Sequence, residues 1–455
     1  MKKNSFNYSK IIVFAIASMC SISACKKDDD QETVTPTPVA TDKSVVEVKD
    51  SITADKTFDK DSIYLIKGYL YVTNNATLTI EAGTIVKGDK ATKATLVIKR
   101  GSKINAVGTV ANPIVFTSNE AAGSRSSGDW GGVVILGKAP VNQGTDILLE
   151  GGAIGSEFVY GGNDAADNSG ILNYVRIEFG GIALQPNKEI NGLTLAGVGS
   201  GTQIDYVQVS YSGDDSYEWF GGNVNAKHII AFKGVDDDFD TDFGFSGKVQ
   251  FAVGLRSPNI ADVSGSNGFE SDNDANSSTL NPFTSAQFSN VSLFGPMATS
   301  TTTFDVLFKR GAHLRRNTKQ SIYNSVIAGY PDGLTVDGAS TEMNAVNNEL
   351  QFKNNVIAGC TNPAVVTPVS GMLVIADWLN NNNNAIYTDN ASLELSDPFN
   401  LTNPNFLPLA TSPLLIEADF TGLTGFDLVT YRGAFGTTNW TNGWSNFDPQ
   451  NAIYK

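Results

Sequence analysis

The sequence predicts an all-β protein whose body, residues 51–432, is wound as a right-handed single-stranded parallel β-helix. Short β-rich runs alternate with turns of Gly, Asn, Asp and Ser, and almost no helical period is present. Glycine contributes 44 of the 455 residues, as expected for a chain with many tight turns. An internal repeat at a fixed spacing points to stacked coils rather than to a closed globular sheet.

The repeat is clearest where residues 206–218 align with residues 228–240, at a constant separation of 22 residues. Related two-strand units follow or precede this pair at residues 191–195, 249–253, 290–294, 324–329 and 355–359. A rung of about 20 to 25 residues with no intervening helix fits a β-helix better than a propeller, whose blades repeat at about 40 to 50 residues. An antiparallel sandwich is the alternative architecture.

The N-terminus has the features of a signal peptide. Lys2 and Lys3 precede an uncharged apolar run over residues 11–24, which is too short to remain as a membrane-spanning helix. The run ends Ile22-Ser23-Ala24-Cys25, which resembles a lipobox. We therefore expect residues 1–24 to be removed and Cys25 to be lipidated, with ordinary secretion as the alternative.

Residues 25–50 combine charged residues with Thr and Pro and predict a flexible tether. Its first part, residues 26–30, resembles the lysine-then-acid export signal of Bacteroidota lipoproteins. We therefore expect the protein to be held in the outer membrane by its lipid and to face the cell exterior. The alternative is that these charges are those of an ordinary lipoprotein tether and carry no export signal.

Composition excludes several classes of function. The formal net charge of −15 opposes binding to nucleic acid or to anionic lipid. Cys20 would leave with the signal peptide and Cys25 would carry lipid, so Cys360 has no partner for an intramolecular disulfide. Only two histidines are present, so a multi-histidine metal centre is not expected.

Two groups of motifs resemble known families. Residues 76–87 and 112–118 resemble the opening rungs of pectate-lyase-like β-helix proteins. Residues 128–133, 173–179 and 431–436, with Trp440 and Trp444, are similar to a family of Bacteroidota cell-surface lipoproteins. The second resemblance covers nearly the whole mature chain and implies a surface β-helix, but it implies little about activity.

Acidic residues recur on one predicted face. Equivalent positions of successive rungs lie about 4.8 Å apart, and alternate side chains point outward. In the 22-residue register Tyr217 and Phe239 face the core, so the acids that follow them point outward, and Phe269 continues the pattern one rung later. The resulting patch of predicted metal ligands is Glu218, Asp240, Asp242, Glu270 and Asp272.

Calcium is the cation that this patch predicts. Crowded carboxylates either acquire raised pKa values or bind a cation, and Ca²⁺ prefers six to eight oxygen ligands. Further donors are expected from the acids of the neighbouring turns, which are Asp214, Asp215, Asp236, Asp237, Asp238 and Asp274. The alternative is that these acids cap turns and keep an exposed sheet soluble.

A basic run over residues 308–316 should occupy the next rung, with the register of its side chains left open. A calcium cluster beside an arginine resembles the arrangement of β-helix polysaccharide lyases, and carboxylates about 5 Å apart also suit a retaining glycoside hydrolase. The candidate catalytic residues are Glu218, Asp240, Asp242, Arg310, His313 and Arg315. Alternatively, the arginines only neutralise the neighbouring acids.

The favoured function is noncatalytic: binding of a glycan or another extracellular ligand through the calcium-bearing acidic face, with an outer-membrane transporter as a candidate partner. A calcium-dependent polysaccharide lyase or glycoside hydrolase is the first alternative, and a structural surface spacer is the second. Residues 433–455 are expected to form a C-terminal cap on the β-helix.

Overall fold

The structure is a computed structural model that describes residues 43–149, 155–185, 188–368 and 370–455. The predicted signal peptide, Cys25 and most of the predicted tether lie outside the described residues. Among the described residues, no helix has both the length and the apolar character that crossing a membrane requires.

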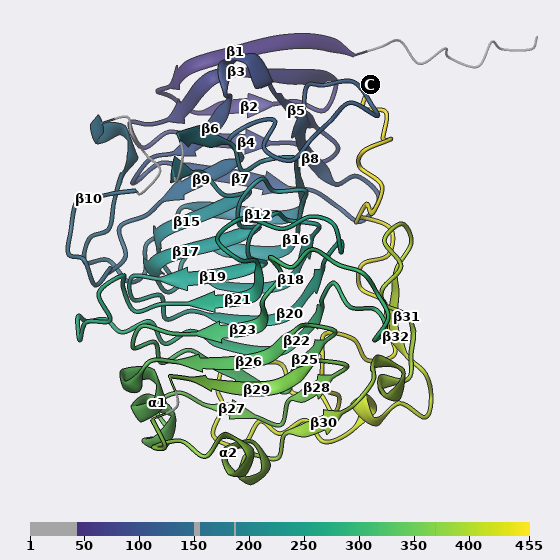
Figure 1. Ribbon diagram of the computed structural model, residues 1–455. Coiled ribbons are helices and arrows are strands. Elements are labelled where there is room, and N and C mark those ends of the chain that lie inside the picture. Colours follow the sequence, from purple (N-terminus) through teal and green to yellow (C-terminus); the bar gives the residue numbers. More distant parts are fainter. Residues whose placement is uncertain (1–42, 150–154, 186–187, 369) are drawn as a thin grey trace, which may run out of the picture. The chain divides into compact units, whose positions relative to one another are not determined.

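The described chain is a parallel β-helix (Figure 1). Twenty-six strands belong to one sheet in the described residues, and the pairings between them are parallel. Each rung passes through three faces, numbered here in chain order. The parallel β-helix predicted from the repeat is therefore present.

Face 1 is formed by short strands and by the first halves of longer ones. Its short strands are β2 (Lys56–Phe58), β4 (Thr77–Ile80), β7 (Lys103–Val107), β24 (Ser321–Tyr323) and β27 (Phe352–Lys353). The longer strands continue round a corner into face 2, and they are β12 (Gly170–Glu178), β16 (Gln203–Ser210), β18 (Asn225–Phe232), β20 (Lys248–Leu255) and β22 (Gln287–Phe294).

Face 2 also contains β5 (Ile85–Gly88), β8 (Ile114–Ser118), β25 (Val326–Ala328), β28 (Val356–Ala358) and β30 (Ala385–Tyr387). Face 3 contains β6 (Thr95–Ile98), β9 (Val133–Leu136), β15 (Leu193–Val198), β17 (Tyr217–Gly222), β19 (Phe239–Asp242), β21 (Asn267–Ser271), β23 (Arg310–Leu314), β26 (Asp332–Asp337) and β29 (Asn362–Thr367). At the N-terminal end β1 (Ser44–Ile52) and β3 (Ser62–Val72) each contribute to faces 2 and 3.

Small elements lie outside the main sheet. Two-stranded pairs are formed by β10 (Ile147–Leu148) with β11 (Val159–Tyr160), β13 (Ala183–Gln185) with β14 (Lys188–Glu189), and β31 (Leu395–Asp397) with β32 (Asn405–Pro408). Two short helices, α1 (Ala339–Val346) and α2 (Ile375–Asn381), interrupt the last rungs. The sequence did not predict these helices, because seven or eight residues are too few to establish a helical period.

Inward side chains fill the coil with apolar groups. Tyr217, Trp219, Phe239 and Phe269 are fully buried, as alternation along the strands predicts. The corner between faces 1 and 2 requires a left-handed backbone on successive rungs, and His228 adopts φ 47° there. Aromatic rings stack along the early rungs of this corner, and asparagines, which tolerate the conformation better, follow at Asn290, Asn324 and Asn354.

The C-terminal segment, residues 405–455, runs back along the side of the coil (yellow in Figure 1). It contacts successively earlier rungs, through Asp419 on Asn324, Asp427 on Gln250, Asn446 on Gln208 and Tyr454 on Glu178. The prediction that residues 433–455 cap the β-helix is therefore wrong, because these residues cover a side of the coil and not its end.

The C-terminal end of the coil is closed by α2 instead. Its Leu379 is buried in the interior cluster, and Trp378 packs against that cluster. The boundaries of the coil differ from those predicted in two further ways: β1 begins at Ser44, inside the predicted tether, and the last strand of the main sheet, β30, ends at Tyr387.

Candidate metal-binding ladder

The acids predicted from the repeat form a row on face 3. Parallel pairing sets Glu218 opposite Asp240, Asp240 opposite Glu270, and Glu270 opposite His313. Thr194 precedes this row and Thr335 follows it. Because the core takes the alternate residues, all these side chains leave the same side of the sheet.

A second row runs beside the first and arises from the turns that precede β17, β19 and β21. The backbone N–H of Asp237 donates to Asp215 Oδ1 over 2.8 Å, and the N–H of Asn267 donates to Asp237 Oδ1. Arg310 pairs with Asn267 on the next rung. The 22-residue repeat that aligns Asp215 with Asp237 is the sequence signal for this row.

The two rows together form one cluster, called the acidic ladder below. Asp215, Glu218 and Asp240 each offer an oxygen within 4.8 Å of the others, and so do Asp237, Asp240 and Glu270. Asp240 belongs to both trios and lies at the centre. Asp214, Asp215 and Asp236 form a third trio at the edge of the cluster.

The ladder concentrates negative charge away from water. Burial raises the pKa of Asp240 well above its ordinary value, and Glu218 and Glu270 raise it further. Burial also raises the pKa values of Asp215 and Asp237 well above their ordinary range, and the surrounding acids add to both shifts. In the folded chain alone, the charged form of these carboxylates is therefore unfavourable.

The donors fit a hard cation. One oxygen of Asp240 is buried without a hydrogen-bond partner, as are the amide oxygens of Asn191 and Asn267, which are 3% and 1% exposed. The same two amides donate to Glu218 and Glu270, so they lie beside the ladder. A set made only of carboxylate and amide oxygens is the set that Ca²⁺ prefers.

The next rung supplies positive charge. His313 Nδ1 lies 3.3 Å from Glu270 Oε2, and His313 Nε2 lies 2.9 Å from Asp337 Oδ2. Burial raises the pKa of Glu270, but the His313 hydrogen bond and the charge of Arg315 outweigh it, and the net shift is downward. The His313 hydrogen bond also lowers the pKa of Asp337.

Asp272 is separated from the acidic ladder by ion pairs. Arg315 Nε donates to Asp272 Oδ1 over 2.7 Å, and a terminal nitrogen of Arg316 lies 2.6 Å from Asp272 Oδ2. Arg315 also pairs with Glu270, and its pKa is raised above its ordinary value although burial opposes this. Asp272 is therefore paired with arginine side chains and belongs to none of the three trios.

Two further predicted residues lie at the margin. Asp242 is half-buried opposite Phe220, accepts the N–H of Phe243 over 2.6 Å, and belongs to none of the trios. In the strand register Arg310 lies opposite Asn267 on one side and Asp332 on the other. Its charge helps to lower the pKa of Asp337.

Among the turn acids, two do not join the ladder. Asp238 is fully buried and forms an ion pair with Arg256 at 2.9 Å, and Asp274 accepts from the backbone of Asn276 and Ser278. Sequence reasoning did not identify Asn191, Asn267 or Asp337. Asn267 could have been found by extending the Asp215–Asp237 row by one rung, whereas the other two carry no signal of their own.

Comparison with known proteins identifies the family of this fold. The family model of the pectate-lyase-like β-helix domain matches residues 50–396, which is more than half of the chain. The chain belongs to the pectate-lyase-like β-helix family.

The acidic ladder lies within the part of the chain that matches the pectate-lyase-like β-helix family. A solved structure described as the crystal structure of pectate lyase Pel9A is similar at 12% sequence identity, covering 84% of this chain and 89% of that one, with a TM-score of 0.43. No curated protein matches the chain. The family assignment therefore rests on the family model.

Proposed function

We propose that the acidic ladder binds Ca²⁺ and that the bound ion holds an anionic glycan against face 3. The supporting observation is the pair of carboxylate trios that share Asp240. A divalent cation would neutralise the charges that burial penalises, and Ca²⁺ can keep ligand positions for groups outside the protein.

Noncatalytic binding is favoured over cleavage because the basic residues Arg315 and His313 are already engaged by carboxylates. Arg315 is engaged by Asp272 and Glu270, and its raised pKa opposes the loss of a proton. Both ring nitrogens of His313 lie within hydrogen-bond distance of carboxylates. A general base must be able to accept a proton from substrate, and neither group is placed to do so.

The proposed setting is the bacterial surface. Lipidation at Cys25 would anchor the coil in the outer membrane, and the segment before β1 would hold it away from the lipid. A ligand captured on face 3 could then pass to an outer-membrane transporter. The acidic charge of the chain makes nucleic acid an unsuitable partner.

The test is calcium titration of the soluble chain, residues 31–455, by calorimetry and thermal melting. We expect saturable binding and a higher melting temperature, both abolished by Asp240→Asn and by Glu270→Gln. Asp61→Asn is the matched control, because the Asp61 side chain is 81% exposed and outside the ladder. Absence of binding heat and of a shift in melting temperature would contradict calcium binding and favour the structural spacer function.

Polysaccharide lyase or glycoside hydrolase activity is the second candidate, favoured by the match of residues 50–396 to the pectate-lyase-like β-helix family. It predicts that calcium-loaded protein releases unsaturated or reducing ends from acidic polysaccharides. Binding of such polysaccharides without any release would support the noncatalytic function, whereas release that is lost in His313→Ala would support the enzyme.

A further inference from the structure

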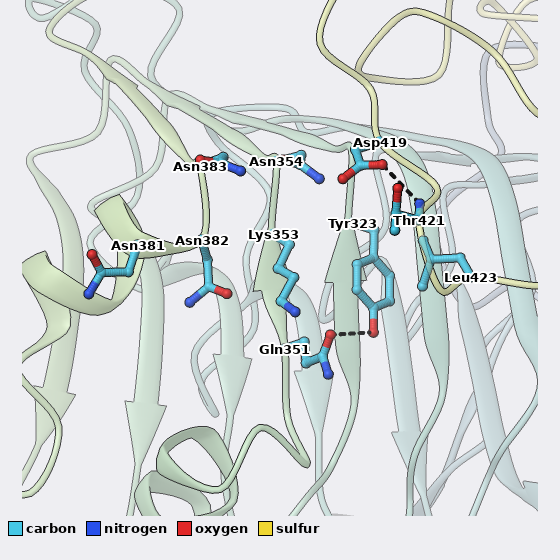
Figure 2. A pocket seen from close by; sticks show the side chains of 10 residues that line it. All are labelled: Tyr323, Gln351, Lys353, Asn354, Asn381, Asn382, Asn383, Asp419, Thr421 and Leu423. Carbon is cyan, nitrogen blue, oxygen red and sulfur yellow. Dashed lines mark hydrogen bonds between the residues drawn. The ribbon is translucent and has the colours of Figure 1, made fainter.

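A second site of different character lies near the C-terminal end of the coil, on face 1. A cavity of about 260 Å³ is bordered by β24, β27, the residues that follow α2, and the returning C-terminal segment (Figure 2). A neighbouring cavity of about 600 Å³ shares Asn354, Asn383 and Asp419 with it. The two cavities thus form one groove, away from the acidic ladder on face 3.

Amide groups dominate the groove. Asn354 is only 8% exposed, lines both cavities, and its side-chain amide has no hydrogen-bond partner in the described chain. The exposed side-chain amides of Asn381, at the end of α2, and Asn383, just after it, also have no hydrogen-bond partner in the described chain. Each amide offers a donor and an acceptor, the combination that a sugar hydroxyl also has.

The wall formed by the C-terminal segment is fixed in place. Buried Asn324 donates to the carbonyl of Asp419 over 3.1 Å and accepts the N–H of Asp419 over 2.9 Å. Beside this wall lies the Tyr323 hydroxyl, which donates to Gln351 over 3.3 Å (dashed in Figure 2). Hydrogen bonds therefore hold the walls of the groove in place, and three elements contribute polar groups to it.

The charges that line the groove balance. Lys353 and Arg432 supply two positive charges, and Glu417 and Asp419 supply two negative charges. Arg432 and Glu417 lie 3.2 Å apart and largely neutralise each other. Unlike the acidic ladder, this groove has no net charge that would select an anion or a cation.

We infer that this groove binds an uncharged, hydroxyl-rich sugar unit without a metal ion. The smaller cavity lies just below the range of about 300 to 1,000 Å³ typical of drug-sized ligands, a size that suits a single monosaccharide. The larger cavity extends the site to a neighbouring unit of an oligosaccharide. This site is independent of the proposed calcium site on face 3.

The test uses saturation-transfer NMR and calorimetry in the presence of EDTA, with the methyl glycosides of glucose, galactose, mannose and N-acetylglucosamine at millimolar concentration. Asn354→Gly removes the buried amide but keeps the left-handed backbone of φ 56° accessible. Asn381→Ala is a second variant, at an exposed helical position where folding is not at risk.

We expect saturable binding of at least one neutral glycoside, weakened about tenfold by each of these two variants. Lys56→Met, on face 1 but remote in the rung order, and Asp240→Asn, in the acidic ladder, should leave it unchanged. Absence of binding by all four glycosides, binding that neither variant alters, or binding of galacturonic acid alone would each overturn the inference. Because EDTA removes calcium, failure of the calcium proposal would not affect this result.

Discussion

Glu178 lies at the end of β12, is 1% exposed, and accepts a hydrogen bond from the Tyr454 hydroxyl over 2.7 Å. Burial raises its pKa above the ordinary value, although Arg176 and the Tyr454 hydrogen bond oppose the shift. The folded state therefore holds a proton on Glu178 more readily than the unfolded state does. The stability that this difference contributes is complete below the unfolded pKa and is lost as the pH rises through the folded pKa.

We predict that Glu178→Gln makes the protein more stable than the wild type at neutral pH and that this advantage disappears in mildly acidic solution. Glutamine keeps an acceptor for Tyr454 and carries no buried charge. The measurement is the melting temperature of both proteins as a function of pH, with exposed Glu47→Gln as control. A stability difference that does not change with pH would contradict the prediction.

At the residue scale, the sequence predicted the row from Glu218 to Glu270 because one constant repeat and the alternation of strands suffice to set it. The side chains of the basic rung could not be placed, since two long turns, residues 272–286 before β22 and residues 295–309 after it, break the repeat. The pairing of Asp272 with Arg315 depends on that unknown register. The pairing of Asp238 with Arg256 joins residues of different faces, which the repeat does not report on.

At the scale of elements, the C-terminal segment is held by aromatic packing on the corner between faces 1 and 2. Trp444 is 1% exposed and meets the rings of Tyr174 and Tyr206 edge-on, each at a centroid distance of 5.9 Å. Its indole N–H donates to the carbonyl of Trp440 over 2.8 Å. Removal of this side chain would open a cavity between the segment and the coil.

We predict that Trp444→Ala lowers the free energy of unfolding of the segment by about 3 to 5 kcal/mol. Limited proteolysis should then release fragments from residues 405–455 while the coil stays intact, because the rungs keep their own pairings. Leu428→Ala is the control, since Leu428 is 77% exposed. Equal proteolysis of the wild type and Trp444→Ala would show that the segment does not depend on this contact.

The path of this segment could not be predicted from sequence. Trp440 and Trp444 have the character of residues that cover apolar surface, but their partners Tyr174 and Tyr206 are more than two hundred positions away. Periodicity reports on neighbouring rungs, where spacing is regular, and it carries no information about a single irregular chain that crosses many rungs. The expected cap failed for this reason.

At the scale of the whole molecule, the coil is a one-dimensional stack. Each rung pairs with the one before and the one after, so a central strand such as β19 has two partners, β17 and β21. At the ends, the one main-sheet partner found among the described residues is β3 for β1 and β28 for β30. Stability in such a stack is the sum of terms for each rung and for its neighbouring interfaces, so end rungs open more easily than central ones.

We predict that hydrogen exchange followed by mass spectrometry finds the slowest amides in β15, β17, β19 and β21 and the fastest strand amides in β1. Most of β1 is exposed, and one edge of it has no strand partner among the described residues. At the other end α2 covers the interior, so β29 and β30 should exchange more slowly than β1 but faster than the centre. Uniform protection from β1 to β30 would mean that the rungs unfold together, and the nearest-neighbour description would then be wrong for this coil.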